Sequence, residues 1–124
     1  MAEERRRETM NVRLDGDELL CPVCGGNYLH QRAVHVFERD QEDSRDGNHV
    51  IVDGATVWAD RCMYGNPSGR RQGLFIEFKC ELCEAARGES AWEEGTPIPF
   101  VLAVSQHKGQ TVVQWVPKPT RRTA

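Results

Sequence analysis

The chain has few apolar residues and no long apolar run. Hydrophobic residues make up 39% of its 124 residues, and the mean hydropathy is −0.61. The longest apolar run, Phe100 to Val104, is far too short to cross a bilayer, and no apolar signal-peptide core follows the charged N-terminal residues. We therefore expect one small domain located in the cytoplasm, without membrane contact.

The central part of the chain also lacks the positive charge that nucleic-acid binders usually carry. Residues 14–116 hold nine Lys or Arg against sixteen Asp or Glu, a balance of −7, whereas the two ends hold seven basic and three acidic residues, a balance of +4. Neutralisation of phosphates supplies most of the affinity for nucleic acid, so this charge distribution favours other partners. Nucleic acid is expected to contact only the ends or a local patch such as Arg70-Arg71.

Neither an internal repeat nor a long helical periodicity occurs in the sequence. Short stretches of β-branched and aromatic residues alternate instead with Gly, Asn, Asp and Pro, which is typical of a mainly β fold with about five or six strands. The expected strands cover residues 28–37, 49–52, 55–59, 73–79, 100–105 and 111–116. Two-residue hairpin turns are expected at Asp53-Gly54 and around Lys108-Gly109. The polar segments 38–48 and 62–72 are predicted loops, and 84–99 is predicted to be a linker or short helix.

Cysteine is scarce, but four of the five cysteines form two pairs with the spacing of metal ligands. Cys21 and Cys24 make the first C-x-x-C pair, and Cys80 and Cys83 make the second. Two intervening residues let one tight turn direct both sulfurs at one ion, and the other pair completes the tetrahedron. The sequence therefore predicts one structural Zn²⁺ per chain. Because four thiolates fill its coordination sphere, we expect the ion to organise the fold and to perform no chemistry.

The two pairs differ in their turn residues. Pro22 restricts φ after the first ligand and Gly25 can adopt the positive φ that ends the turn, whereas Glu84 stands at the position equivalent to Gly25. Iron bound by the same four thiolates and a redox-active C-x-x-C pair are the alternatives. A thioredoxin-like pair requires a strand-to-helix turn, and reduced thiols in the cytoplasm favour metal binding over disulfides.

Three further groups suggest chemistry without a supporting motif. Cys62 follows a positive charge, Arg61, which would favour a nucleophilic thiolate, but no histidine base is tied to it by sequence. His35 and His49 would approach each other if their strands pair, and with Asp40 or Asp43 they could form a second metal site; packed histidines are the default interpretation. A triad of Ser68, His107 and Asp60 has no nucleophile-elbow signal.

Two polar segments are candidates for contact with a partner. Arg70-Arg71 is the only basic pair between the two ends, and it follows a Gly- and Pro-containing loop whose backbone N–H groups could help to hold a phosphate or carboxylate. The simpler interpretation is that both arginines pair with the acidic segment around 38–46. His107 and Lys108, in the turn between the last two expected strands, could also touch a ligand.

Three motifs together resemble the zinc-ribbon family, in particular small uncharacterised bacterial and phage-encoded four-cysteine proteins. A Cys-Pro-x-Cys-Gly knuckle runs into a Tyr-Leu-His strand at 21–30, an Asn-Pro-Ser-x-Arg-Arg loop occupies 66–71, and a Gln-His-Lys-Gly turn occupies 106–109. The resemblance implies a zinc-ribbon-like antiparallel sheet with two C-x-x-C knuckles. Fifty-five residues separate Cys24 from Cys80, so a long insertion is expected between the knuckles.

These observations predict a zinc-binding β domain over 19–116, between a charged flexible tail at 1–18 and a basic disordered tail at 117–124. The expected function is a non-enzymatic binding module that recognises another protein. The alternative is a nucleic-acid-associated zinc ribbon acting in transcription or in phage–host regulation. An enzyme that uses Cys62 or a histidine metal site is a third, weaker alternative.

Overall fold

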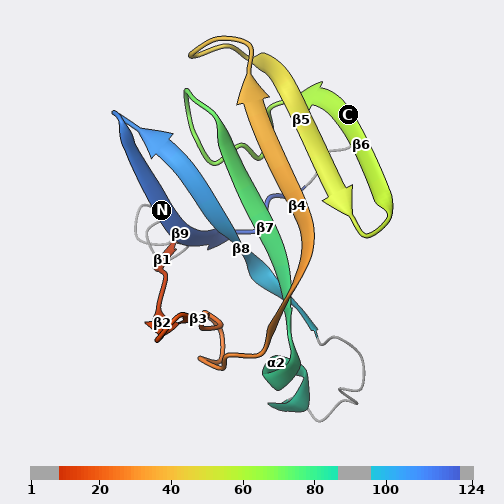
Figure 1. Cartoon of the computed structure of the whole chain (residues 1–124), viewed down its shortest axis with the longest axis vertical. Coiled ribbons are helices and arrows are strands. Elements are labelled where there is room, and N and C mark those ends of the chain that lie inside the picture. Colours follow the sequence, from red (N-terminus) through yellow and green to blue (C-terminus); the bar gives the residue numbers. More distant parts are fainter. Residues whose placement is uncertain (1–8, 87–95, 121–124) are drawn as a thin grey trace.

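The computed structural model describes residues 9–86 and 96–120, which form a mainly β structure with one short helix, α2 (Glu81–Ala86) (Figure 1). The predicted fold class is confirmed. The strands in chain order are β1 (Met10–Asn11), β2 (Leu14–Asp15), β3 (Glu18–Leu19), β4 (Leu29–Arg39), β5 (Asp46–Asp53), β6 (Thr56–Cys62), β7 (Gly73–Cys80), β8 (Thr96–His107) and β9 (Gln110–Pro117).

Seven of these strands form one antiparallel sheet in the order β1-β9-β8-β7-β4-β5-β6, and β2 and β3 form a separate small hairpin. The central pair is β4 and β7, whose register places Leu29 opposite Cys80. The start of β4, just after the first cysteine pair, therefore lies beside the end of β7, where the second pair begins. Figure 1 shows this end of the sheet next to α2, and the hairpin turns of β4–β5 and β8–β9 at the other end.

The two expected hairpin turns have different outcomes. The β8–β9 turn is confirmed: His107 pairs with Gln110, and the two residues between them, Lys108 and Gly109, have φ values of 51° and 81°. The β5–β6 turn is displaced by one residue from the prediction, because Asp53 pairs with Thr56 and leaves Gly54 and Ala55 as the central residues. Only Gly54 has a positive φ, as expected when glycine takes the first central position of such a turn.

The predicted loop at 38–48 is shorter than expected. Strand β4 continues to Arg39 and β5 begins at Asp46, so the connection covers only 40–45. Polar residues at strand ends pair through their backbones without adding to the apolar periodicity, so a hydrophobic pattern misses them. Gly47 pairs with Arg39, and a Cβ atom there would lie 2.3 Å from the carbonyl oxygen of Glu38. This close approach explains the glycine.

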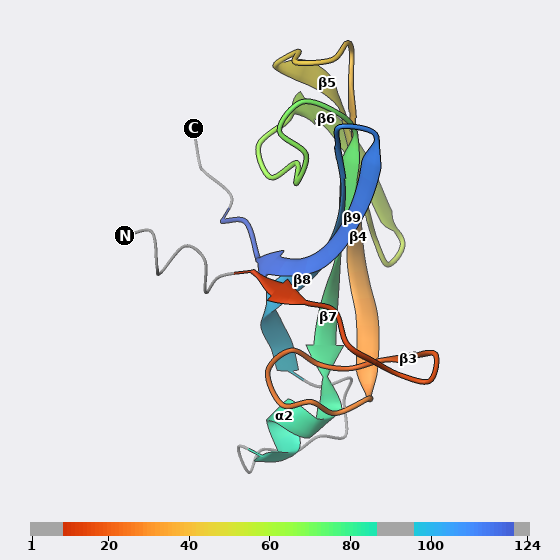
Figure 2. The same ribbon diagram turned by 90° about the vertical axis from the view of Figure 1, so that its left-hand side faces the viewer.

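Two clusters of buried side chains form the core. One cluster contains Cys21, Cys80, Ile98 and Trp115 and lies at the cysteine end of the sheet. The other contains Phe37, Phe75, Val101 and Ala103. The loop between β6 and β7 and the described C-terminal residues lie on the same side of the sheet (Figure 2), and Pro119 approaches to 3.5 Å of the Cβ position of Gly65.

Parts of both predicted tails lie within the described ranges. Met10 pairs with Trp115 in the sheet, and the backbone N–H of Lys118 donates to the carbonyl of Pro99 over 2.9 Å. Residues 1–8 and 121–124 lie outside the described ranges, as do residues 87–95 of the predicted linker or short helix at 84–99. The division into one domain and two tails stays a prediction. Among the described residues, no helix has the length and apolar character needed to cross a membrane.

Candidate functional site

The structure brings the two cysteine pairs together. Cys21 and Cys24 lie in the loop between β3 and β4, Cys80 ends β7, and Cys83 lies in α2. The Sγ atoms of Cys21 and Cys83 are 3.8 Å apart, those of Cys24 and Cys80 are 3.6 Å apart, and all four sulfurs lie within 4.8 Å of one another. Each of these two short distances joins one cysteine of the first pair to one of the second.

The distances suit a tetrahedral metal ion. With a metal–sulfur bond of about 2.3 Å, neighbouring sulfurs of a tetrahedron lie about 3.8 Å apart. The four cysteines are therefore within metal-binding distance and are consistent with a zinc-ribbon-like module. Because Cys21 and Cys80 are fully buried in the core cluster with Trp115, an ion bound here would join the N-terminal loop to the centre of the sheet.

Backbone N–H groups orient the sulfurs in both turns. The N–H groups of Val23, Gly26 and Cys83 each point at a cysteine sulfur, with N–S distances of 3.4 Å. In the first turn Gly25 has a φ of 82°, as its sequence context predicts. The second turn needs no such glycine at Glu84, because the chain continues from β7 directly into α2.

The thiol groups do not ionise equally. Burial raises the pKa of Cys80 to about 11, and burial together with the neighbouring sulfurs raises the pKa of Cys83. Burial also opposes ionisation of Cys24, but the hydrogen bond from the N–H of Gly26 and the surrounding thiols lower its pKa overall. Four adjacent thiolates require a cation to offset their repulsion, so metal uptake here must release protons.

The redox alternative has one feature in its favour and one against it. Cys80 and Cys83 do lie at a strand-to-helix junction, which is the local geometry of a thioredoxin-like pair. However, the sulfur of each lies beside a sulfur of the first pair, at 3.6 and 3.8 Å, so all four thiols share one site.

His35 and His49 meet, as their strand pairing allows, but not beside the predicted carboxylates. Asp40 pairs with Arg61 and Asp43 with Arg70, and the histidines contact Glu77 and Asp60 instead. Both rings stack on core phenylalanines, His49 on Phe37 at 4.3 Å and His35 on Phe75 at 4.2 Å between ring centroids. Among the described residues, the four cysteines are the only cluster with three or more metal-ligand atoms in reach of one ion.

The four ring nitrogens of this pair form a continuous row of three hydrogen bonds. His49 Nδ1 is 3.0 Å from Asp60 Oδ1, His49 Nε2 is 3.0 Å from His35 Nδ1, and His35 Nε2 is 3.2 Å from Glu77 Oε2. Each outer contact needs an N–H directed at a carboxylate, and the inner contact needs one N–H between the rings. The three bonds form together when the two rings carry three protons, which places a single positive charge between two carboxylates.

The carboxylates that end this row are held in the ionised form. The hydrogen bond with His35 lowers the pKa of Glu77 below its ordinary value of 4.5, against the effect of burial and with the help of Lys118. Burial raises the pKa of Asp60, but hydrogen bonds from the N–H of Cys62 and from His49 outweigh it, and the pKa is lowered.

Replacing Glu77 with Gln is expected to remove an acid-sensitive part of the stability. Because the pKa of Glu77 is lower in the folded than in the unfolded chain, its carboxylate stabilises the fold above about pH 4.5, and this contribution is lost as the pH falls through the folded value. The free energy of unfolding of the wild type should exceed that of Glu77→Gln most at about pH 7, and the difference should shrink below about pH 4.5. Urea unfolding measures the difference at each pH at which both proteins still retain the metal. A gap that does not shrink toward the acid end of that range contradicts the prediction.

The predicted triad does not assemble. Ser68 is buried, and its hydroxyl donates to the carbonyl of Gln72 and accepts from the N–H of Gln106. The third member, Asp60, contacts His49 instead. The two hydrogen bonds of Ser68 fix the 66–72 loop against β8. Cys62 is exposed at the end of β6, and its N–H donates to Asp60. Whether its thiol reacts unusually fast stays a prediction.

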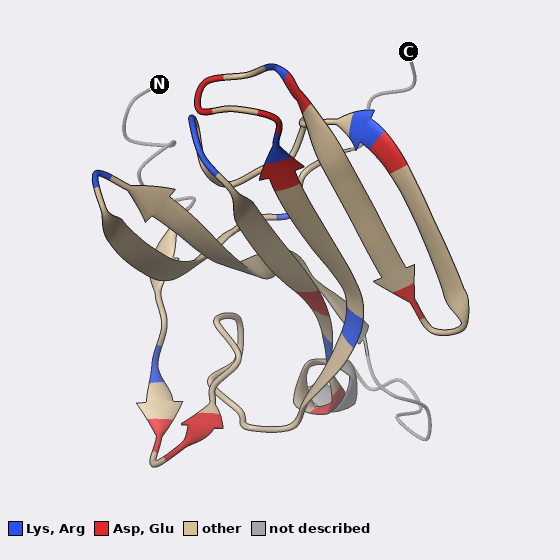
Figure 3. Ribbon diagram, turned by 45° about the horizontal axis from the view of Figure 1, so that its top comes forward, with Lys and Arg blue, Asp and Glu red and all other residues tan. Residues whose placement is uncertain are grey.

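All four predicted contact residues line one pocket. Arg70 and Arg71 from the 66–72 loop, and His107 and Lys108 from the β8–β9 turn, enclose a space of about 370 Å³ together with Glu42, Gly69 and Gln106. We call this the loop pocket. It lies at the end of the sheet where the acidic β4–β5 loop and the basic tips of the other two loops gather (Figure 3).

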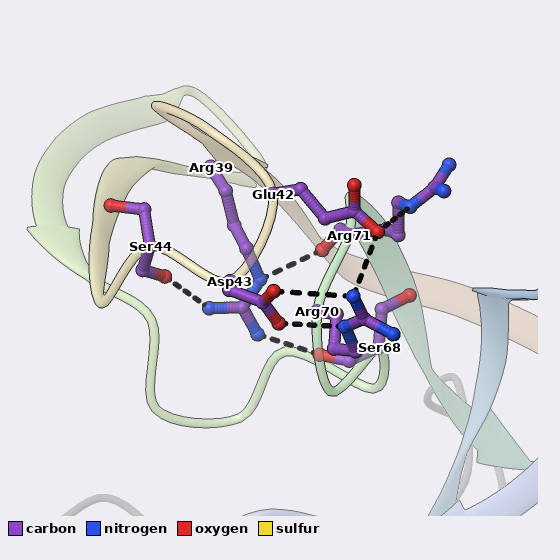
Figure 4. Close-up of polar contacts among 7 residues, drawn as sticks. All are labelled: Arg39, Glu42, Asp43, Ser44, Ser68, Arg70 and Arg71. Carbon is purple, nitrogen blue, oxygen red and sulfur yellow. Dashed lines mark hydrogen bonds and ion pairs between the residues drawn. The ribbon is translucent and has the colours of Figure 1, made fainter.

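The arginines of the loop pocket pair with the acidic loop, as the simpler interpretation predicts (Figure 4). Arg70 Nε and an outer nitrogen lie 2.7 and 3.2 Å from the two carboxylate oxygens of Asp43, and Arg71 Nε lies 3.0 Å from Glu42. The hydrogen bond from Arg70 lowers the pKa of Asp43 and raises that of Arg70.

Sequence reasoning missed Arg39, which joins the β4–β5 loop to the 66–72 loop. Its guanidinium donates to the carbonyls of Arg71, Ser44 and Ser68 over 3.0, 2.6 and 2.7 Å (Figure 4). An arginine at a strand end resembles any exposed cation in the sequence, and its backbone acceptors are not visible there. No local signal would have identified it.

No protein-family model, no curated protein and no solved structure matches this chain. Its function must therefore be argued from the residues themselves. Two features carry that argument: the cysteine cluster at one end of the sheet and the loop pocket at the other.

Proposed function

We propose that this chain is a non-enzymatic binding module, stabilised by one structural Zn²⁺ at Cys21, Cys24, Cys80 and Cys83, that recognises another protein through the loop pocket. The observation that carries the proposal is the convergence of Arg70, Arg71, His107 and Lys108, which come from two separate segments of the sequence, on one pocket. The cysteine cluster lies at the opposite end of the sheet, so the ion supports the scaffold that presents the loops.

Zinc is the proposed ion because four thiolates in tetrahedral arrangement are its usual structural ligand set. A zinc site of this kind has no free coordination position, which supports a role without catalysis. The resemblance of the two knuckles and two loops to zinc-ribbon proteins supports the same assignment. Iron remains the alternative ion, and elemental analysis of the purified protein distinguishes the two metals.

The charge distribution supports a protein partner rather than nucleic acid. Arg70 and Arg71 are already paired with Asp43 and Glu42, and residues 14–116 carry a balance of −7. One face of the sheet is also apolar and exposed. Val52 and Val57 pair across β5 and β6 at 42% and 64% exposure, and Val36 in β4 is 41% exposed. Exposed apolar faces of this kind favour protein contacts.

The test uses the metal-loaded chain with labelled single-stranded and double-stranded DNA and RNA, followed by fluorescence anisotropy at low and moderate salt. We expect no binding at either salt concentration. Capture of proteins from source-cell lysate should survive nuclease treatment and weaken in Lys108→Gly, but not in Arg13→Gln, which removes a cation outside the pocket. Binding to nucleic acid that weakens steeply with salt would instead support the alternative, a ribbon that uses Arg70, Arg71, Lys108 and the basic ends.

A further inference from the structure

We propose that the loop pocket binds a carboxylate-bearing segment of the partner, an acidic peptide, and that Lys108 is the cation that receives it. This inference rests on the proposed function and names the chemistry of the partner. Three independent observations support it: the backbone conformation of Lys108, the cations that line the pocket, and the way in which its walls are fixed.

Lys108 occupies a backbone conformation that lysine disfavours. Among the described residues only two other than glycine have a positive φ, Asp43 at 71° and Lys108 at 51°. Lys108 lines the loop pocket, and Asp43 binds Arg70, which also lines it. The first position of a two-residue turn of this type usually holds Asn, Asp or Gly. Residues with a strained backbone concentrate at functional sites, where the surrounding structure holds them in place.

The lining of the pocket is positive although the molecule is acidic. Three cations, Arg70, Arg71 and Lys108, line it together with a single carboxylate, Glu42. The two arginines hold Glu42 and Asp43, whereas the side chain of Lys108 has no ion pair within residues 9–86 and 96–120. Lys108 is therefore the cation that can engage an incoming anion without first breaking a contact.

The existing contacts indicate which anion the pocket suits. Arg70 contacts both oxygens of Asp43, and Arg71 contacts Glu42. The guanidinium groups of the loop pocket are therefore already oriented for carboxylates. A second carboxylate beside Glu42 could share Arg71 and bind Lys108.

The walls of the pocket are fixed before any ligand binds. The buried Ser68 hydroxyl joins Gln72 to Gln106, and thus joins the 66–72 loop to β8. Asn66 caps the same loop by accepting from the N–H of Ser68 over 2.9 Å and donating to the carbonyl of Arg71 over 3.1 Å. Because these groups are already ordered, little conformational entropy is lost when a ligand binds.

The test titrates the metal-loaded, ¹⁵N-labelled full chain with capped hexaglutamate and follows the backbone amide signals. We expect saturable shifts at residues 69–71 and 106–109, and none with hexalysine. Lys108→Gly should weaken the peptide about two- to fivefold, the range for one exposed ion pair. Its melting temperature should equal or exceed that of the wild type, because glycine adopts this φ without strain. Lys108→Arg and Arg13→Gln should bind like the wild type.

Two results overturn the inference. Either hexaglutamate leaves the signals of 69–71 and 106–109 unchanged, or Lys108→Gly binds it as tightly as the wild type does. If lysate capture still depends on Lys108 in that case, the proposed function stands and only the carboxylate assignment fails. A third result overturns both proposals: a short oligonucleotide that shifts these signals at lower concentration than hexaglutamate shows that the pocket prefers nucleic acid to a protein segment.

Discussion

Replacing Cys80 with Ser is expected to abolish both metal binding and cooperative folding. Cys80 ends the central strand β7, is fully buried, and lies 3.6 Å from the sulfur of Cys24. A serine hydroxyl does not replace a thiolate as a ligand, and structural zinc in small sites contributes roughly 10–16 kcal/mol to folding. Native mass spectrometry should find one metal per wild-type chain and none in the variant, and thermal unfolding followed by circular dichroism should lose its sigmoidal transition.

Cys62→Ser is the matched control for this experiment. Cys62 is exposed at the end of β6 and belongs to neither pair, so its replacement should leave both the metal content and the melting temperature unchanged. Removing the ion from the wild type with a chelator should reproduce the effect of Cys80→Ser. If Cys80→Ser melts like the wild type and retains one metal, the shared four-cysteine site is wrong.

Replacing Trp115 with Ala is expected to reduce the free energy of unfolding by about 3–5 kcal/mol, the range for removing a buried aromatic side chain. Trp115 is 1% exposed in β9, pairs with Met10, and contacts Phe78 edge-on with ring centroids 5.7 Å apart. It belongs to the same core cluster as Cys21 and Cys80. Denaturant unfolding of the metal-loaded proteins measures the loss, and Trp115→Phe should cost much less because it preserves most of the volume.

The same variant tests whether the metal site and the sheet form one cooperative unit. Because Trp115 packs in the cluster that holds two of the four ligands, its loss should also weaken metal retention against a competing chelator. Unchanged metal affinity in a clearly destabilised Trp115→Ala would mean that the two cysteine turns hold the ion independently of the sheet.

The features that could be predicted from the sequence depend on residues that are close together along the chain. The spacing of the two C-x-x-C pairs predicts two turns that each present two sulfurs. Gly109, between two apolar stretches, predicts the β8–β9 turn because glycine adopts a positive φ without strain. The loop at 38–48 was predicted too long, and the Asp53-Gly54 turn was predicted one residue early. In both regions polar residues pair through their backbones, which hydrophobic patterns do not reveal.

The features that could not be predicted depend on register between strands far apart in the sequence. His35 was expected to meet His49, but its other partner, Glu77, comes within reach only because β4 and β7 are neighbours in the sheet. The predicted carboxylates Asp40 and Asp43 lie between the two histidines in the sequence and pair with arginines instead. Arg39 binds three carbonyls that come together only after the loops have folded.

The sequence by itself determined the mainly β fold class, the ligand set of the candidate metal centre and the residue types of the loop pocket, because each follows from local composition and spacing. Only the tertiary structure decided that the cysteines form one cluster, that four distant residues share a pocket, and that two histidines form a row with two carboxylates. The physical reason is that sheet order and register bring these groups together, and both are set by the packing of the whole core.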